Sequence, residues 1–169
     1  SIALHGFSPP VAGDVVKTGE GGESPWVAAS WQDGTLKLPP RPETAPAPSQ
    51  RGPRGPGYVY LNANSDREQT LILEAQGNSA VLVNGTWRAG NIYANLTMPV
   101  PVSLHPGSNG FLLATSGRGT LKAELKEPPQ PVFFHMGDLT LPDWLPGATE
   151  PAWAAIIVVN TTGNWLQGL

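Results

Sequence analysis

The fold is decided by the stretch Ala80-Val81-Leu82-Val83-Asn84-Gly85-Thr86-Trp87-Arg88. Four apolar residues lead into Asn84-Gly85, and a short segment follows that can run back alongside them. An Asn-Gly pair is the strongest short signal for a hairpin, because a type I′ turn requires a positive φ at both central residues. The stretch therefore predicts two antiparallel strands joined by a two-residue turn.

Further strand candidates recur on both sides of this hairpin, about every ten residues, with turn residues between them. They are Tyr58–Ala63, Gln69–Ala75, Val100–Leu104, Phe111–Thr115 and Thr120–Lys126. In Val100–Leu104 the apolar residues Val100, Val102 and Leu104 alternate with Pro101 and Ser103. Pro101 predicts an edge position for its strand, because proline cannot donate to a ladder of hydrogen bonds. No segment has helical periodicity. The pattern predicts an all-β protein built as an antiparallel β-sandwich.

Composition supports this fold and excludes several classes of function. The 169 residues include 20 Gly and 19 Pro, and only 14% are charged, as suits short strands joined by many turns. Because there are no cysteines, disulfides, thiolate metal sites and cysteine nucleophiles are excluded. A net charge of -3 with scattered basic residues argues against a nucleic-acid partner. The longest apolar run, Ala152–Val159, is too short for a membrane helix, so no membrane partner is expected.

Proline-rich segments divide the chain into three parts. Residues 1–57 form an N-terminal extension that ends in the Pro- and Gly-rich linker Pro39–Gly57, residues 58–127 form the sandwich module, and residues 128–169 begin with the Pro-rich exit Pro128–Pro131. In the extension, Trp26–Trp31 and Thr35–Leu38 flank the turn Asp33-Gly34 and predict a hairpin.

The third part contains two further strand candidates, Val132–Phe134 and Ala154–Val159. Two interpretations stay open for them: they begin a second β-domain, or they complete the first one. A buried strand without a neighbour would leave its backbone groups unpaired, so one of the two is required.

Three segments together resemble the galactose-binding-domain-like jelly rolls that are appended to bacterial secreted hydrolases. They are Ala80–Gly85, Val100–Leu104 and Gly107–Leu113. The resemblance covers about 70 residues, from Tyr58 to Leu125. The sequence departs from the pattern at Pro101 and at Gly110, where an aliphatic residue would be expected.

The resemblance implies an accessory module that binds carbohydrate or supports a neighbouring catalytic domain of the same polypeptide. Low charge, the lack of cysteine and abundant Thr, Asn and Trp favour a secreted or periplasmic protein. Fold alone does not choose between the functions.

Candidate ligand-binding residues come from the six tryptophans, since indole offers a flat apolar face and one donor for stacking on sugar rings. Trp87, Trp144 and Trp153 lie in or near predicted turns and loops, and Asn84 adds a displayed amide. The alternative for these tryptophans is packing in the core or at a domain interface.

Catalytic machinery is sparse in the sequence. His5 and His105 are predicted to be surface residues, and the pair His135 and Asp138 has no associated nucleophile. We therefore expect a non-catalytic module, with a hydrolase acting on glycans or esters as one alternative and a structural protein-interaction domain as another. No cofactor is expected, although a structural calcium ion bound through backbone carbonyls would leave little trace in residue types.

Overall fold

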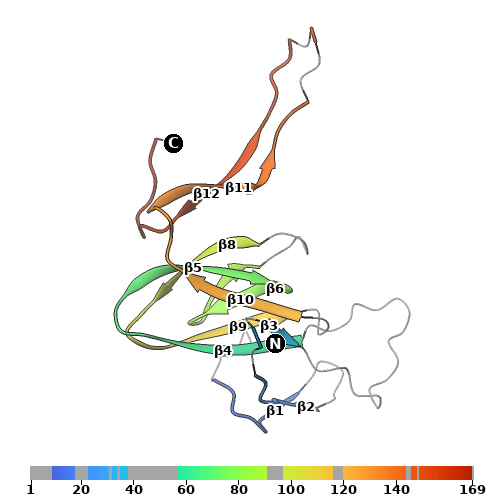
Figure 1. Cartoon of the computed structure of the whole chain (residues 1–169), viewed down its shortest axis with the longest axis vertical. Helices are drawn as coiled ribbons and strands as arrows, with labels where there is room; N and C mark the ends of the chain where they lie inside the picture. Colours follow the sequence, from blue (N-terminus) through green and yellow to red (C-terminus); the bar gives the residue numbers. More distant parts are fainter. Residues whose placement is uncertain are drawn as a thin grey trace, which may run out of the picture.

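The computed structural model describes residues 9–17, 23–30, 32–33, 35–37, 57–90, 97–115, 120–143, 146–147 and 149–168. Two four-stranded antiparallel sheets form the body of the protein (Figure 1). The described residues form strands, turns and irregular segments without a helix, which confirms the predicted all-β sandwich. In this part of the chain there is therefore no helix that could cross a membrane.

The first sheet has the order β3-β10-β5-β8 and the second has the order β4-β9-β6-β7. The strands of the first are β3 (Thr35–Lys37), β10 (Thr120–Lys126), β5 (Gln69–Gln76) and β8 (Met98–Leu104). Those of the second are β4 (Gly57–Ser65), β9 (Gly107–Thr115), β6 (Asn78–Val83) and β7 (Thr86–Ala89). Every strand predicted between residues 58 and 127 is present.

The turn between β6 and β7 has the predicted geometry. Asn84 has φ 48° and Gly85 has φ 83°, so both central residues are in the left-handed region that a type I′ turn requires. Val83 and Thr86 pair directly across the turn. This local geometry sets the register of the two strands.

The core lies between the sheets and follows from the alternation of side chains along each strand. Its buried members are Leu36, Leu73, Ala75, Val81, Val83, Val102, Leu104, Phe111, Leu113 and Leu121. Burying one large apolar side chain stabilises a fold by about 1.5–3 kcal/mol, so this set provides most of the driving force.

The position of β8 confirms the prediction drawn from its proline. Among the described strands it pairs only with β5, at the end of the first sheet. Pro99 and Pro101 can lie there because the free side of an edge strand needs no amide donor.

In the N-terminal extension, Gln32 and Thr35 form an antiparallel bridge around the predicted turn and Asp33 has φ 50°, but the strand predicted before the turn is absent from the described residues. Trp26–Ser30 is not a strand, whereas Thr35–Lys37 is confirmed as β3 and pairs with β10 instead. The physical reason is burial: on β10, β3 inserts Leu36 into the core, where it is 5% exposed. Trp31, Gly34 and the linker residues 38–56 lie outside the described residues.

Two smaller sheets complete the described structure. β1 (Val15–Lys17) pairs with β2 (Glu23–Pro25), and β11 (Val132–Thr140) pairs with β12 (Ala155–Asn160). The β11–β12 hairpin extends away from the sandwich at the side of β8, which β12 touches (Figure 1). Its strands pair with each other and with no other described strand.

Candidate functional site

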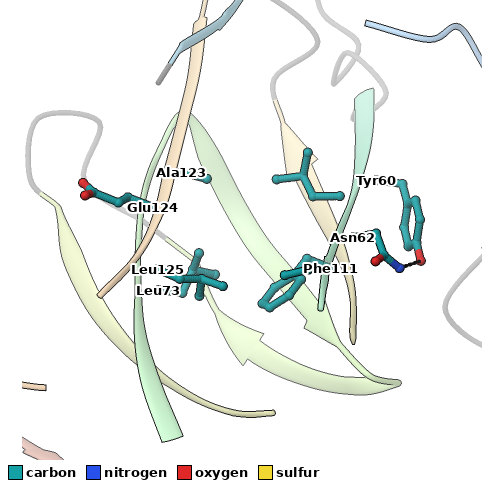
Figure 2. Close-up of a pocket in the computed structure, with 9 residues that line it drawn as sticks. Tyr60, Asn62, Leu73, Phe111, Ala123, Glu124 and Leu125 are labelled. Atoms are coloured by element: carbon teal, nitrogen blue, oxygen red, sulfur yellow. Dashed lines mark hydrogen bonds between the residues drawn. The ribbon is translucent and has the colours of Figure 1, made fainter. Parts of the chain in front are cut away.

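An open groove lies on the side of the sandwich opposite β8, between β4 and β10. β4 is the last strand of its sheet, and β3 covers β10 only along Thr120–Lys122. The remaining part of β10, residues 123–126, has no described strand on that side. In the described part of the chain the sheets therefore do not close there, and a pocket of about 380 Å³ opens between them (Figure 2).

The lining of this open groove is mostly apolar. It comprises Leu61 and Ala63 of β4, Leu73 of β5, Phe111 of β9, and Ala123 and Leu125 of β10, with Tyr60, Asn62 and Glu124 at its margins. The apolar members occupy the alternate positions of each strand whose side chains face inward. They belong to the core or pack against it. The groove is thus a part of the core that the described residues leave accessible. Its volume lies within the range of ligand and peptide sites.

Tyr60 and Asn62 lie on the other side of the β4 ribbon from Phe111 (Figure 2). The Asn62 amide donates to Ser108 Oγ at 2.5 Å and to the Tyr60 hydroxyl at 3.4 Å. A Cβ atom on Gly110 would lie 2.9 Å from the Tyr60 hydroxyl oxygen and 3.1 Å from its ring. This close approach explains why glycine stands where the resemblance would place an aliphatic residue.

Asn84, a predicted ligand residue, lies at an exposed turn, where hydrogen bonds hold its side chain against the start of β9. Its Oδ1 accepts from the Gly110 amide at 2.9 Å, and its Nδ2 donates to Asn109 Oδ1 at 2.8 Å. The fully buried Asn109 also accepts from the His105 amide and donates to the carbonyls of His105 and Gly107. Both polar atoms of the Asn84 side chain therefore already have partners that fix the turn.

The predicted tryptophans lie on separate elements. Trp87 is on β7, paired with Leu82, and is 46% exposed. Trp153 is 87% exposed and lies just before β12, in the projecting hairpin. Trp144 lies outside the described residues. Of the predicted tryptophans, the structure thus shows two with exposed rings, one on the sandwich and one on the hairpin, and their role in ligand binding stays a prediction. Trp165, which was not predicted as a ligand residue, is also exposed, at 95%.

A further apolar surface, which we call the hairpin face, lies on β11 and β12. Phe134 pairs with Val158, so their side chains share one side of the hairpin with the next alternate residues, Met136 and Ile156. These four side chains are 36–62% exposed. On the opposite side, Val159 is only 3% exposed. The hairpin therefore buries one of its two apolar sides and leaves the other uncovered.

Each of the two described histidines lies against a residue of its own segment. The His135 ring lies against Gly137, since a Cβ there would approach the ring nitrogen Nε2 to 2.9 Å. His105 Nδ1 lies 3.2 Å from the Pro106 carbonyl oxygen. No group of three or more His, Asp or Glu side chains in the described ranges is arranged to hold a metal ion.

One ion-pair network crosses the outer face of the first sheet. Lys126 on β10 binds Glu74 on the neighbouring β5, and its Nζ lies 3.3 Å from a Glu124 carboxylate oxygen. The hydrogen bond to Glu74, followed by that to Glu124, raises the pKa of Lys126 above its ordinary value of 10.5. The charges beside the open groove are therefore largely paired with one another.

Fold and site together define an antiparallel β-sandwich with one open apolar side and a projecting apolar hairpin. Comparison with models of protein families, with curated proteins and with solved structures gives no match to the chain.

Sequence reasoning did not predict the open groove or the hairpin face. A signal for the groove was present, because Gly57–Ser65 contains neither a charged residue nor a proline that could protect an edge strand. This lack of charge and proline becomes informative only once the strand order shows that β4 is at an edge.

Proposed function

We propose that the protein is a non-catalytic accessory β-sandwich module, of the galactose-binding-like type, that brings protein domains together through its β11–β12 hairpin. The hairpin face carries this proposal, because Phe134 and Met136 are 59% and 62% exposed on a sheet of only two strands. A two-stranded sheet is marginal in water unless it packs on something, and contiguous exposed apolar side chains mark interaction surfaces. A protein partner would cover these side chains.

The setting we propose is a secreted or periplasmic protein of bacterial origin, in which the module serves a neighbouring catalytic domain of the same polypeptide. The resemblance to the appended jelly rolls of secreted hydrolases supports this setting. The buried apolar core between the two sheets supports the role of a scaffold.

Site-specific photo-crosslinking tests the docking role. A photoreactive phenylalanine analogue would replace Phe134 in the protein produced in its own cells, with Val27, which is 70% exposed outside the hairpin, as the control site. We expect adducts from position 134 that map to one defined protein segment, and none from position 27. Diffuse adducts, or equal yields at the two sites, would contradict the proposal.

The non-catalytic part of the proposal has a separate test. The purified chain would be assayed with chromogenic glycosides and esters, since hydrolysis of glycans or esters is the alternative activity. We expect no turnover above buffer. Turnover that is lost in His135→Ala would contradict the proposal and favour an enzyme.

Carbohydrate binding is a second candidate function, favoured by the exposed ring of Trp87 on β7. Stacking of a sugar on this ring would bury apolar surface and give a modest affinity. A glycan array would be probed with the chain, with Trp87→Ala and with Trp153→Ala, and thermal stability would be recorded for each. Binding that only Trp87→Ala abolishes would support a site on the sandwich, and an array without any binding would contradict it.

A further inference from the structure

The edge strands of this protein differ in how they are protected from pairing with other chains. An exposed edge offers unpaired backbone groups, and natural proteins protect such edges by short length, charge, proline or a bulge. β8 has Pro99 and Pro101, β7 has four residues including Arg88, and β3 has three residues. These edges all carry a recognised protection.

The short β1 and β2 have only three residues each, and β11 has an irregular register between His135 and Thr140. They too are poor templates for an added strand.

Two edges carry none of these protections. β4 has nine residues in unbroken register with β9, and its sequence contains no charge and no proline. β12 has six residues, Ala-Ile-Ile-Val-Val-Asn, again without charge or proline. Among the described strands, each of them pairs on one side only. Both edges are therefore competent to add a strand.

The surfaces beside these two edges are complementary in chemistry. The open groove next to β4 is an apolar concavity between the sheets, lined by Leu61, Phe111 and Leu125 among others. The hairpin face on β12 presents Ile156 and Val158, which are 39% and 36% exposed. A strand added to the edge of β4 would direct alternate side chains into this groove.

The two surfaces cannot meet within one molecule. β12 touches β8, at one end of the first sheet, whereas the groove lies between β4 and β10 on the opposite side of the sandwich (Figure 1). The order β3-β10-β5-β8 places β5 and β10 between them. The surface that fits the hairpin is therefore available only on another molecule.

We infer that β12 of one molecule adds to the edge of β4 in a second copy of this chain and inserts Ile156 and Val158 into its open groove. The contact is head-to-tail, because it joins different surfaces of the two copies. Each added molecule leaves one groove and one hairpin free, so the assembly grows into open chains unless the rotation between copies closes a ring. The inference rests on the proposed function, since it names the partner of the hairpin.

Sedimentation velocity over a range of concentrations is the first experiment. The chain is expected to form species larger than a dimer as its concentration rises. Val158→Lys would place an ammonium group in the apolar groove and should weaken association at least about a hundredfold. Val27→Lys adds the same charge at an exposed site outside the hairpin and should leave association unchanged.

A mixing experiment tests the head-to-tail geometry itself. Val158→Lys has a disabled hairpin and an intact groove, whereas Ala123→Lys has a disabled groove and an intact hairpin. Each variant alone should be monomeric, and an equimolar mixture should form a 1:1 dimer that grows no further. Asn64→Lys, at an exposed position of β4, replaces Ala123→Lys if that variant loses its circular dichroism spectrum.

The outcomes separate this inference from the proposed function. A wild-type chain that stays monomeric at every concentration, or variants that do not complement each other when mixed, would overturn the inference. The docking role of the hairpin would then still hold if photo-crosslinks from position 134 map to a different protein. If the crosslinks from position 134 were absent as well, both the inference and the proposed docking role would be contradicted.

Discussion

The sandwich and the hairpin both contain apolar strands, yet the hairpin leaves the apolar side chains of one of its sides uncovered. β9 places Phe111 and Leu113 in the core, at 3% and 0% exposure, whereas Ile156 and Val158 of β12 stay 39% and 36% exposed. The difference is the presence of a second sheet opposite β9 and the absence of a described one opposite the hairpin face. Whether the apolar side chains of a strand are buried therefore depends on a second sheet that covers them, and not on the sequence of the strand.

The largest expected effect comes from removing one apolar side chain from each region and comparing the two losses of stability. Leu113→Ala should lower the free energy of unfolding by about 3–5 kcal/mol, because it leaves a cavity between the sheets. Val158→Ala, in dilute protein, should change it by less than about 0.5 kcal/mol, as for other surface substitutions. Urea denaturation followed by tryptophan fluorescence measures both, and equal losses would contradict the contrast.

The next effect concerns the buried polar part of the sandwich, which differs from the exposed hydrogen bonds of Asn160 at the end of the hairpin. Asn109→Ala removes four hydrogen bonds and leaves the His105 amide and the Asn84 side chain without their partner. We expect a loss of about 2–3 kcal/mol in the free energy of unfolding, because the Asn109 side chain is fully buried and makes all four bonds. Asn64→Ala, at an exposed position, is the matched control, and similar losses in the two variants would show that the network is not important for stability.

The smallest effect is expected on the outer face of the first sheet. The folded pKa of Lys126 is raised, so its stabilisation is fully present below the unfolded value of 10.5 and is lost as the pH rises through the folded pKa. Lys126→Met should therefore lower the Tm slightly at neutral pH, and it should not change the Tm once the pH exceeds the folded pKa of Lys126. Because the pair is exposed, added salt should also reduce the difference. A difference that grows with pH would contradict this account.

The sequence was sufficient to predict the sandwich because its signals are local. The Asn84-Gly85 turn sets one register, Pro101 predicts an edge, and the alternation in Thr120–Lys126 identifies the inward side chains. Each of these depends on backbone geometry within a few residues. The structure confirms all three.

The candidate site was not predictable in the same way, because it depends on strand order. Leu36 joins the core only because β3 pairs with the distant β10, and the groove opens because β3 begins at Thr35, opposite Lys122, and does not cover the later residues of β10. Asn84 was predicted as a ligand residue, and its bonds to Asn109 and Gly110 depend on β9, which lies elsewhere in the sequence. Such long-range pairings leave no signal in a single segment.

Hydrogen exchange at low and at high protein concentration tests the central claim most directly, because it compares individual edges within one sample. The account predicts that amides of β4 and β12 exchange more slowly as concentration rises, while those of the proline-protected β8 and the central β9 do not change. In Val158→Lys this dependence on concentration should disappear. Exchange rates of β4 and β12 that are the same at both concentrations, or an equal slowing at β8, would contradict the claim that the two unprotected edges join copies of this protein.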